Sequence, residues 1–239
     1  MLLVHGAHHG AGCWDGWVAA LTARGLPAAA LDLRGHGALA AEGLDPAAGV
    51  MDYAADMTAA ARALPRPPVL VGHSLGALVV LAATARLRAP AAGLVLVAPS
   101  PPGNLPGVAA VPPVPEGAPR PPPPRAVAIA RWMGGTEPPS SVAEPWLAGL
   151  CAESPRALNE RYTLAIAVDP AVVTAPVLVM EAGRDDAERH PPGQDAALAR
   201  FLGAEHVLLP DAPHCLMLGI WCEPSASIIA EWIHRLPRS

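Results

Sequence analysis

The stretch that decides the fold runs Pro68-Val69-Leu70-Val71-Gly72-His73-Ser74-Leu75-Gly76-Ala77-Leu78-Val79-Val80. A short apolar run enters a G-x-S-x-G pentapeptide and a long apolar run leaves it, which predicts a strand, a sharp turn at Ser74 and a helix. The flanking glycines allow close approach of the chain, and the N-terminus of the helix favours negative charge beside the serine. A serine that only caps a helix is the alternative. The context favours Ser74 as a nucleophile.

Similar apolar runs recur along the chain and end in Gly, His, Asp or Pro. Unbroken runs of this length are typical of strands that are buried on both faces of a parallel sheet. We expect strands at Leu2–Val4, Ala28–Leu33, Val69–Val71, Leu94–Ala98, Val177–Met180 and His206–Leu209, and helices at Trp14–Arg24, 50–63, Leu75–Arg88, Gln194–Leu202 and Pro224–Leu236. This alternation predicts an α/β fold with about six mostly parallel strands and helices on both faces of the sheet.

One region interrupts this alternation. Residues 99–124 contain 12 prolines and 3 glycines, and proline removes donors and fixes φ, which excludes a central strand or a helix interior. Helical patterns resume at Arg125–Met133, Ala143–Leu150 and around Pro155–Ala167. We expect a core made of 1–99 and 168–239, with 100–167 inserted as a Pro-rich start and a helical cap. A disordered linker between two domains is disfavoured, because the two strands after it cannot close a core alone.

Composition narrows the function classes. The 239 residues are 52% hydrophobic and 15% charged, which excludes a disordered protein, and the net charge of −5, with all 16 basic residues Arg, disfavours nucleic acid as a partner. We find no apolar targeting segment and no uninterrupted run of 18 apolar residues, so we expect a cytoplasmic protein without membrane insertion. The cysteines, Cys13, Cys151, Cys215 and Cys222, have no CxxC spacing and are expected to be reduced. The oligomeric state stays open, a homodimer included.

A serine nucleophile needs a base and an orienting acid. His214 follows the last predicted strand, and Asp185 and Asp186 both follow the strand before it. We prefer Asp186 as the acid over Asp185. The order Ser74, Asp186, His214 is the order of α/β-hydrolase triads.

Backbone N–H groups must also stabilise the oxyanion. Leu75 follows the nucleophile and supplies one of them. The loop after the first strand, His5-Gly6-Ala7, supplies the other, and our candidate is the N–H of Ala7.

These residues identify the whole chain as similar to the α/β-hydrolase superfamily. The opening Leu3-Val-His-Gly-Ala-His-His-Gly-Ala-Gly-Cys-Trp14, the segment Ala30-Leu-Asp-Leu-Arg-Gly-His-Gly37 and the late His214-Cys-Leu-Met-Leu resemble the methylesterase/hydroxynitrile-lyase family of plants and its bacterial relatives. That resemblance implies hydrolysis of small esters, or cleavage of cyanohydrins, in a pocket under a helical cap. The lyases of that family carry a threonine where this chain has Gly6 and a lysine where it has Cys215.

We therefore expect a serine esterase that cleaves a small carboxylic ester through an acyl-enzyme. The alternatives are a non-hydrolytic lyase on the same triad and a catalytically silent protein that binds a small molecule in the same pocket. His73, Trp132 and Trp146 are candidate pocket residues, although the two tryptophans could equally pack the cap onto the sheet. No organic cofactor is implied, and no metal either, since no Asp, Glu or His cluster accompanies the early histidines.

Overall fold

The strands form one parallel sheet in the order β2-β1-β3-β4-β5-β6 in the computed structural model, which describes residues 1–236. Their bounds are β1 Leu2–Val4, β2 Ala29–Leu31, β3 Val69–His73, β4 Gly93–Val97, β5 Val177–Ala182 and β6 Glu205–Leu209. Every neighbouring pair is parallel. The predicted α/β fold with about six strands is therefore confirmed, and the expected strand ends were correct to within two residues.

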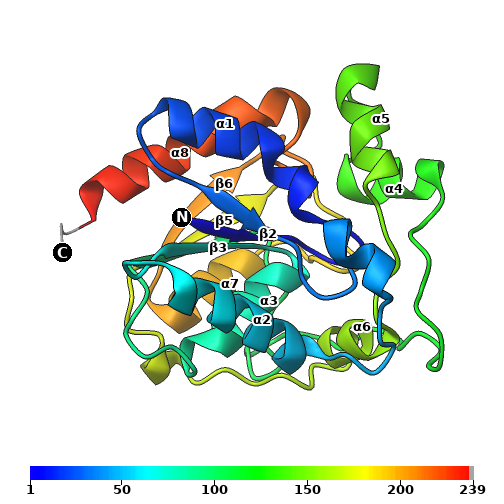
Figure 1. Ribbon diagram of the computed structural model, residues 1–239, viewed down its shortest axis with the longest axis horizontal. Helices are drawn as coiled ribbons and strands as arrows, with labels where there is room; N and C mark the ends of the chain where they lie inside the picture. Colours follow the sequence, from blue (N-terminus) through cyan, green and yellow to red (C-terminus); the bar gives the residue numbers. More distant parts are fainter. Residues whose placement is uncertain (237–239) are drawn as a thin grey trace.

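Helices cover both faces of the sheet (Figure 1). One face carries α1 (Asp15–Ala23) and α8 (Cys222–Arg235), and the other carries α2 (Val50–Ala63), α3 (Leu75–Thr84) and α7 (Gln194–Leu202). The strand side chains divide accordingly: Leu3, Val71 and Val95 pack in the cluster with α1 and α8, whereas Leu70 and Leu94 pack in the cluster with α2 and α3. Burial of apolar strands on both faces supplies the driving force for this architecture.

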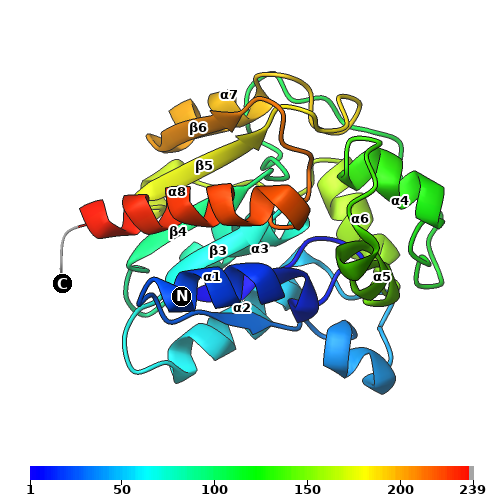
Figure 2. The same ribbon diagram turned by 90° about the horizontal axis from the view of Figure 1, so that it is seen from above.

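The segment between β4 and β5 lies beyond one end of the strands (Figure 2). It contains α4 (Arg125–Trp132), α5 (Ser140–Ala148) and α6 (Pro155–Tyr162), and we call residues 100–167 the insertion. Because β5 and β6 complete the same sheet as β1 to β4, the insertion does not join two separate sheets. Short 3-10 helices occur elsewhere, at Ala11–Trp14, Gly37–Glu42, Pro170–Val172 and Gly219–Trp221.

The Pro-rich start of the insertion has no helix or strand, but its backbone is held by α6 and the residues around it. Arg120 and Glu153 exchange two backbone hydrogen bonds, at 2.8 and 2.9 Å. The side chain of Asn159 on α6 bonds both the N–H and the C=O of Val114, at 2.8 and 3.0 Å. The prolines prevent this segment from forming a regular helix or strand, and these contacts supply hydrogen-bond partners for some of its backbone groups.

Two helices end at least four residues earlier than the sequence pattern predicts. The third helix stops at Thr84 rather than Arg88, and α6 stops at Tyr162, where Leu164 soon adopts a positive φ of 59° that no helix continues through. Within residues 1–236, no helix combines the length and the apolar character needed to cross a membrane.

Candidate active site

Ser74 lies at a tight turn between β3 and α3. Its backbone has φ 51° and ψ −118°, a conformation that a non-glycine residue rarely adopts. The turn is held by a hydrogen bond from the Ser74 N–H to the carbonyl of Val97, at 2.9 Å, and by one from the N–H of Ser100 to the Ser74 carbonyl, at 3.0 Å. Such strain is retained only where the surrounding structure imposes it, and it is common at functional sites.

The two glycines of the pentapeptide are required by close packing. A Cβ on Gly76 would lie 2.4 Å from the carbonyl oxygen of His5, and a Cβ on Gly72 would lie 2.4 Å from the carbonyl oxygen of Gly76. Both distances are far inside van der Waals contact, so α3 can approach β1 and β3 only because these residues lack side chains. The turn thereby presents Ser74 to the cavity above the sheet.

The imidazole of His214 is bonded to Asp185. Its Nδ1 lies 2.7 Å from Asp185 Oδ2, and because a carboxylate only accepts, Nδ1 carries the proton and Nε2 is left as the basic nitrogen. Asp185 is buried, and burial raises the pKa of its carboxyl. The adjacent His214 and His190 and the N–H of Asp186 lower this pKa by more, and the net shift is downward.

The structure corrects the preferred orienting acid from Asp186 to Asp185. Asp186 turns away from His214: its carboxylate bonds Nη1 of Arg189 at 3.2 Å and the N–H of Glu188 at 3.1 Å. The loop after β5 decides this, because the N–H of Gly183 bonds the carbonyl of Leu209 and places the next residues against the loop after β6. Asp186 supports the pair only through its backbone N–H, which bonds Asp185 Oδ1 at 2.6 Å.

The two expected oxyanion donors border the same cavity as Ser74 and His214. Ala7 and Leu75 both line it. The loop after β1, residues 5–10, which we call the β1 loop, passes very close to the turn: a Cβ on Gly6 would lie 3.1 Å from Cβ of Ser74. Glycine at position 6 therefore lets the backbone of the β1 loop approach the serine.

The β1 loop is held in place by contacts from the insertion. The N–H of His8 donates to Oε2 of Glu153 at 3.2 Å, and the N–H of Cys151 donates to the carbonyl of His8 at 2.8 Å. Trp146 donates its Nε1–H to Nε2 of His9 at 3.0 Å, so Nδ1 of His9 carries the proton and donates to the carbonyl of Ala7 at 2.8 Å. The insertion thus determines the position of Ala7.

Glu153 is the centre of a buried polar cluster. Besides His8, its carboxylate accepts from Tyr53 Oη at 2.6 Å, from the N–H of Ser154 at 2.8 Å and from Nε2 of His36 at 3.1 Å. Burial raises the pKa of the Glu153 carboxyl, but the hydrogen bonds and charge of His36 and Tyr53 outweigh it and lower the pKa to about 2. No sequence motif marks this residue, because its partners come from distant segments.

The structure separates the predicted pocket residues. Trp132 lines the Ser74 cavity. Trp146 instead lines a second cavity, next to His9 and Cys13. His73 differs from the expectation as well, since it is buried behind His214 and its Nε2 lies 3.1 Å from the His214 carbonyl. Its side chain therefore packs against the loop after β6, which carries His214, and does not line the cavity.

His190 is a further buried side chain beside the pair. Its ring centroid lies 4.7 Å from that of His214, and its Nδ1 lies 3.9 Å from Asp185 Oδ2. Burial is the main reason that the pKa of His190 falls to about 3, so its ring is neutral. Asp185, His190 and His214 each place one possible metal-ligating atom within 4.8 Å of the others. The direct hydrogen bond between Asp185 and His214 already uses two of these atoms.

Fold, turn and site together define the class of the protein. The sequence profile of the alpha/beta hydrolase family matches residues 1–219, and the chain belongs to this family. Part of it is similar to Esterase PIR7B of Oryza sativa subsp. japonica, with 44% identity over 100 residues. Probable esterase PIR7A of Oryza sativa subsp. indica is 40% identical over 99 residues. Each match spans 41% of this chain and only 37% of the length of the rice protein.

Solved structures resemble the chain over nearly its whole length. The methylesterase MES16 from Arabidopsis has a TM-score of 0.73 at 19% identity, covering 98% of this chain and 99% of that one. Polyneuridine aldehyde esterase has a TM-score of 0.70 at 15% identity, covering 96% of this chain and 98% of that one. At these identities the likeness establishes the fold.

Proposed function

We propose that this protein is a serine esterase that cleaves small carboxylic esters through an acyl-enzyme. One observation carries the proposal: a serine on a strained turn, a histidine bonded to a buried carboxylate and two candidate oxyanion donors all border one cavity. The names of the rice relatives, both esterases, support the same activity.

The first half of the reaction forms the acyl-enzyme. Oγ of Ser74 attacks the ester carbonyl while Nε2 of His214 takes its proton, and Asp185 stabilises the imidazolium that results. The N–H groups of Ala7 and Leu75 bond the oxygen on which negative charge develops. His214 then gives its proton to the alcohol oxygen as the C–O bond breaks, and the alcohol leaves.

The second half regenerates the enzyme. Water loses a proton to Nε2 of His214 and attacks the acyl carbon, and the tetrahedral species collapses with return of the proton to Oγ of Ser74. Every proton passes through His214, so its Nδ1–H bond to Asp185 must hold throughout. The downward shift of the Asp185 pKa supports a carboxylate that stays ionised at neutral pH.

The cavity supports a small substrate. It has about 80 Å³ of free volume, which favours a short acyl group and a short alcohol.

The four cysteines are unpaired, and this supports a reducing compartment such as the cytoplasm.

Labelling with a fluorophosphonate tests the proposal together with turnover of p-nitrophenyl acetate. We expect the wild-type protein to be labelled once and Ser74→Ala to be neither labelled nor active, with turnover reduced by at least about 10³-fold. An unlabelled wild-type protein, or equal turnover by both proteins, would disprove the proposal. A protein that only binds its ligand would give that result.

A further inference from the structure

The Ser74 cavity contains a buried guanidinium that the proposed reaction does not use. Arg161 lies in the last turn of α6, lines the cavity and is only 8% exposed. Its Nε–H donates to Oγ of Ser100 at 3.3 Å, and the N–H of Ser100 is bonded to the carbonyl of Ser74. Ser100 therefore links the guanidinium of Arg161 to the backbone of Ser74 through two hydrogen bonds.

This guanidinium has no carboxylate partner within residues 1–236. Its other hydrogen bond is from Nη2 to the carbonyl of Arg189, at 2.6 Å, so two of its five N–H groups have acceptors and three remain available. Burying a cation without an ion-pair partner is costly. The unfavourable burial also lowers the pKa of Arg161, although a guanidinium of this kind stays charged at neutral pH.

The neighbouring charges do not neutralise Arg161. Asp185 is bonded to His214 and to a backbone N–H, and Asp186 is paired with Arg189. Arg131 of α4 adds a further positive charge to the cavity wall. The three arginines and two aspartates that line the cavity leave a net positive charge beside Ser74.

We propose that the substrate is an ester with a free carboxylate a few bonds from its scissile bond, and that Arg161 binds this carboxylate. A carboxylate accepts from a guanidinium through two oxygens, which matches the N–H groups left on Arg161. The limited volume of the cavity restricts the distance between ester and acid, so monoesters of short dicarboxylic acids fit best. This inference rests on the proposed esterase function.

The test compares monomethyl glutarate with methyl glutaramate, in which an uncharged amide replaces the carboxylate. We expect kcat/KM of the wild-type enzyme to be about 10- to 100-fold higher for the acid, which corresponds to one charge-assisted hydrogen-bonded pair. Arg161→Gln should abolish most of this preference through a higher KM for the acid, while kcat/KM for the amide stays within about threefold. Arg161→Lys keeps the positive charge but loses the paired N–H groups of the guanidinium, so it should retain part of the preference for the acid.

Arg156→Gln is the matched control, because Arg156 lies on the same helix, is exposed and pairs with Glu160. Its preference for the acid should equal that of the wild type. Equal rates for both esters in the wild type, or an unchanged preference in Arg161→Gln, would overturn the inference while leaving the esterase proposal intact.

A second measurement needs no Arg161 variant and covers the case in which that variant does not fold. Glutarate should inhibit wild-type hydrolysis of p-nitrophenyl acetate competitively, at least about tenfold more strongly than the uncharged diamide glutaramide. Calorimetric titration of Ser74→Ala with glutarate detects the same site if no ester is turned over. Failure of glutarate to bind or inhibit would refute the carboxylate site, whatever the outcome for hydrolysis.

Discussion

Asp185 and Asp186 are adjacent in the chain and have different partners. Asp185 bonds the imidazole of His214 at 2.7 Å, and Asp186 bonds Arg189. The two identical side chains therefore have different roles. Asp185 sets the tautomer of His214, and Asp186 holds the chain at Glu188 and Arg189. Substitution of each tells them apart.

Asp185→Asn should lower kcat by about 10³- to 10⁴-fold, the size of effect expected when the orienting carboxylate of a triad is replaced by its amide and the histidine tautomer is lost. Asp186→Asn keeps the backbone N–H that bonds Asp185 and should cost less than about tenfold. Steady-state kinetics with p-nitrophenyl acetate measures both. A larger loss in Asp186→Asn than in Asp185→Asn would contradict the geometry.

That Ser74 and His214 lie at one cavity was predictable, because local patterns mark both residues. A pentapeptide between a strand and a helix marks the serine, and the end of the last strand marks the histidine. The sequence does not choose between adjacent aspartates, since that choice depends on hydrogen bonds from Gly183 to Leu209 and from Arg184 to Ala212. The position of Arg161 in the cavity was not predictable for the same reason, because it depends on how α6 packs.

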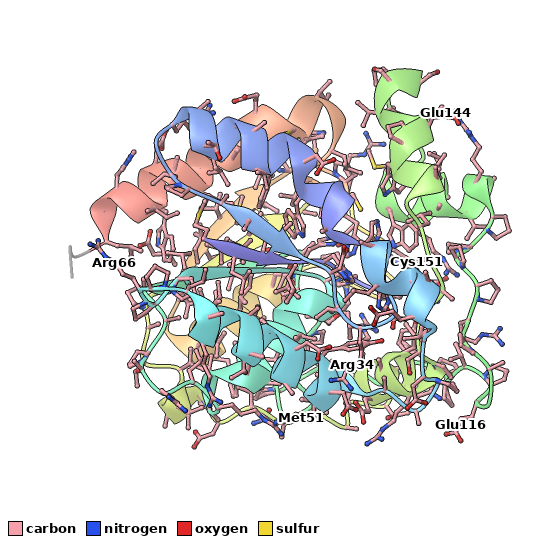
Figure 3. The ribbon with its side chains drawn as sticks, in the orientation of Figure 1. Arg34, Met51, Arg66, Glu116, Glu144 and Cys151 are labelled. Carbon is pink, nitrogen blue, oxygen red and sulfur yellow. The ribbon has the colours of Figure 1, made fainter. Side chains whose placement is uncertain are left out.

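At the scale of elements, the link between α5 and α6 holds the β1 loop. Glu153 on this link accepts from His8, Tyr53 and His36, which belong to the β1 loop, to α2 and to the segment after β2. Cys151, labelled in Figure 3, bonds the β1 loop through its own N–H. One buried carboxylate therefore joins the insertion to two other elements and to the loop that carries Ala7.

Glu153→Gln should lower the free energy of unfolding by about 3 kcal/mol, because it breaks a buried charged pair and leaves donors facing an amide. For a chain of this size that corresponds to a fall in Tm of about 6–12 °C by thermal denaturation. Glu144→Gln is the control: Glu144 projects from α5 into solvent and pairs with Arg125 (Figure 3). Exposed pairs contribute little, so a similar fall in both variants would be evidence against the role of Glu153.

The pH dependence of this contribution follows from the two pKa shifts. The pKa of Glu153 falls from 4.5 to about 2, so its stabilisation is complete above 4.5 and is lost as pH falls towards 2. The pKa of His36 is raised above 6.5 by Glu153 despite burial, so its stabilisation is complete below 6.5 and is lost as pH rises. The stability difference between wild type and Glu153→Gln should therefore be largest between pH 4.5 and 6.5. Denaturant unfolding from about pH 3 to about pH 8 measures this difference, and a difference that stays constant over the whole of that range would contradict the ion pair.

The elements themselves were predictable where burial alone decides them. Strands such as Leu2–Val4 and helices such as Gln194–Leu202 follow from unbroken apolar runs and from apolar periodicity. The path of the Pro-rich segment was not predictable, because its partners, such as Asn159 for Val114, lie 45 residues away. Non-local hydrogen bonds of this kind leave no local signature.

At the scale of the whole molecule, the insertion and the sheet share their core. Ala128, Ile129, Met133 and Trp146 of the insertion are buried in the same cluster as the strands and α1 and α8. Leu105 and Ala157 are buried in the cluster on the other face. Because its buried apolar side chains belong to the clusters of the sheet, the insertion has no core of its own.

The protein should consequently unfold in one transition. Far-UV circular dichroism and tryptophan fluorescence should give coincident denaturant curves, since coincidence of probes is the test of two-state unfolding. Trp132 and Trp146 report on the insertion and Trp14, Trp17, Trp221 and Trp232 on the rest. Replacing the first two by Phe should leave the midpoint of the fluorescence curve equal to that from circular dichroism in the same variant. Two resolved transitions would show that the insertion folds separately.

The Ser74 cavity and the second cavity are divided by an aromatic partition. His8 and Trp132 face the Ser74 cavity, and His9 and Trp146 face the second cavity, which has about 570 Å³ of free volume. The rings of His9 and Trp132 are 4.9 Å apart, so the partition is only two side chains thick. For the proposed esterase, a small residue in place of Trp132 would join the two cavities and extend the accepted substrates from compact esters to long ones.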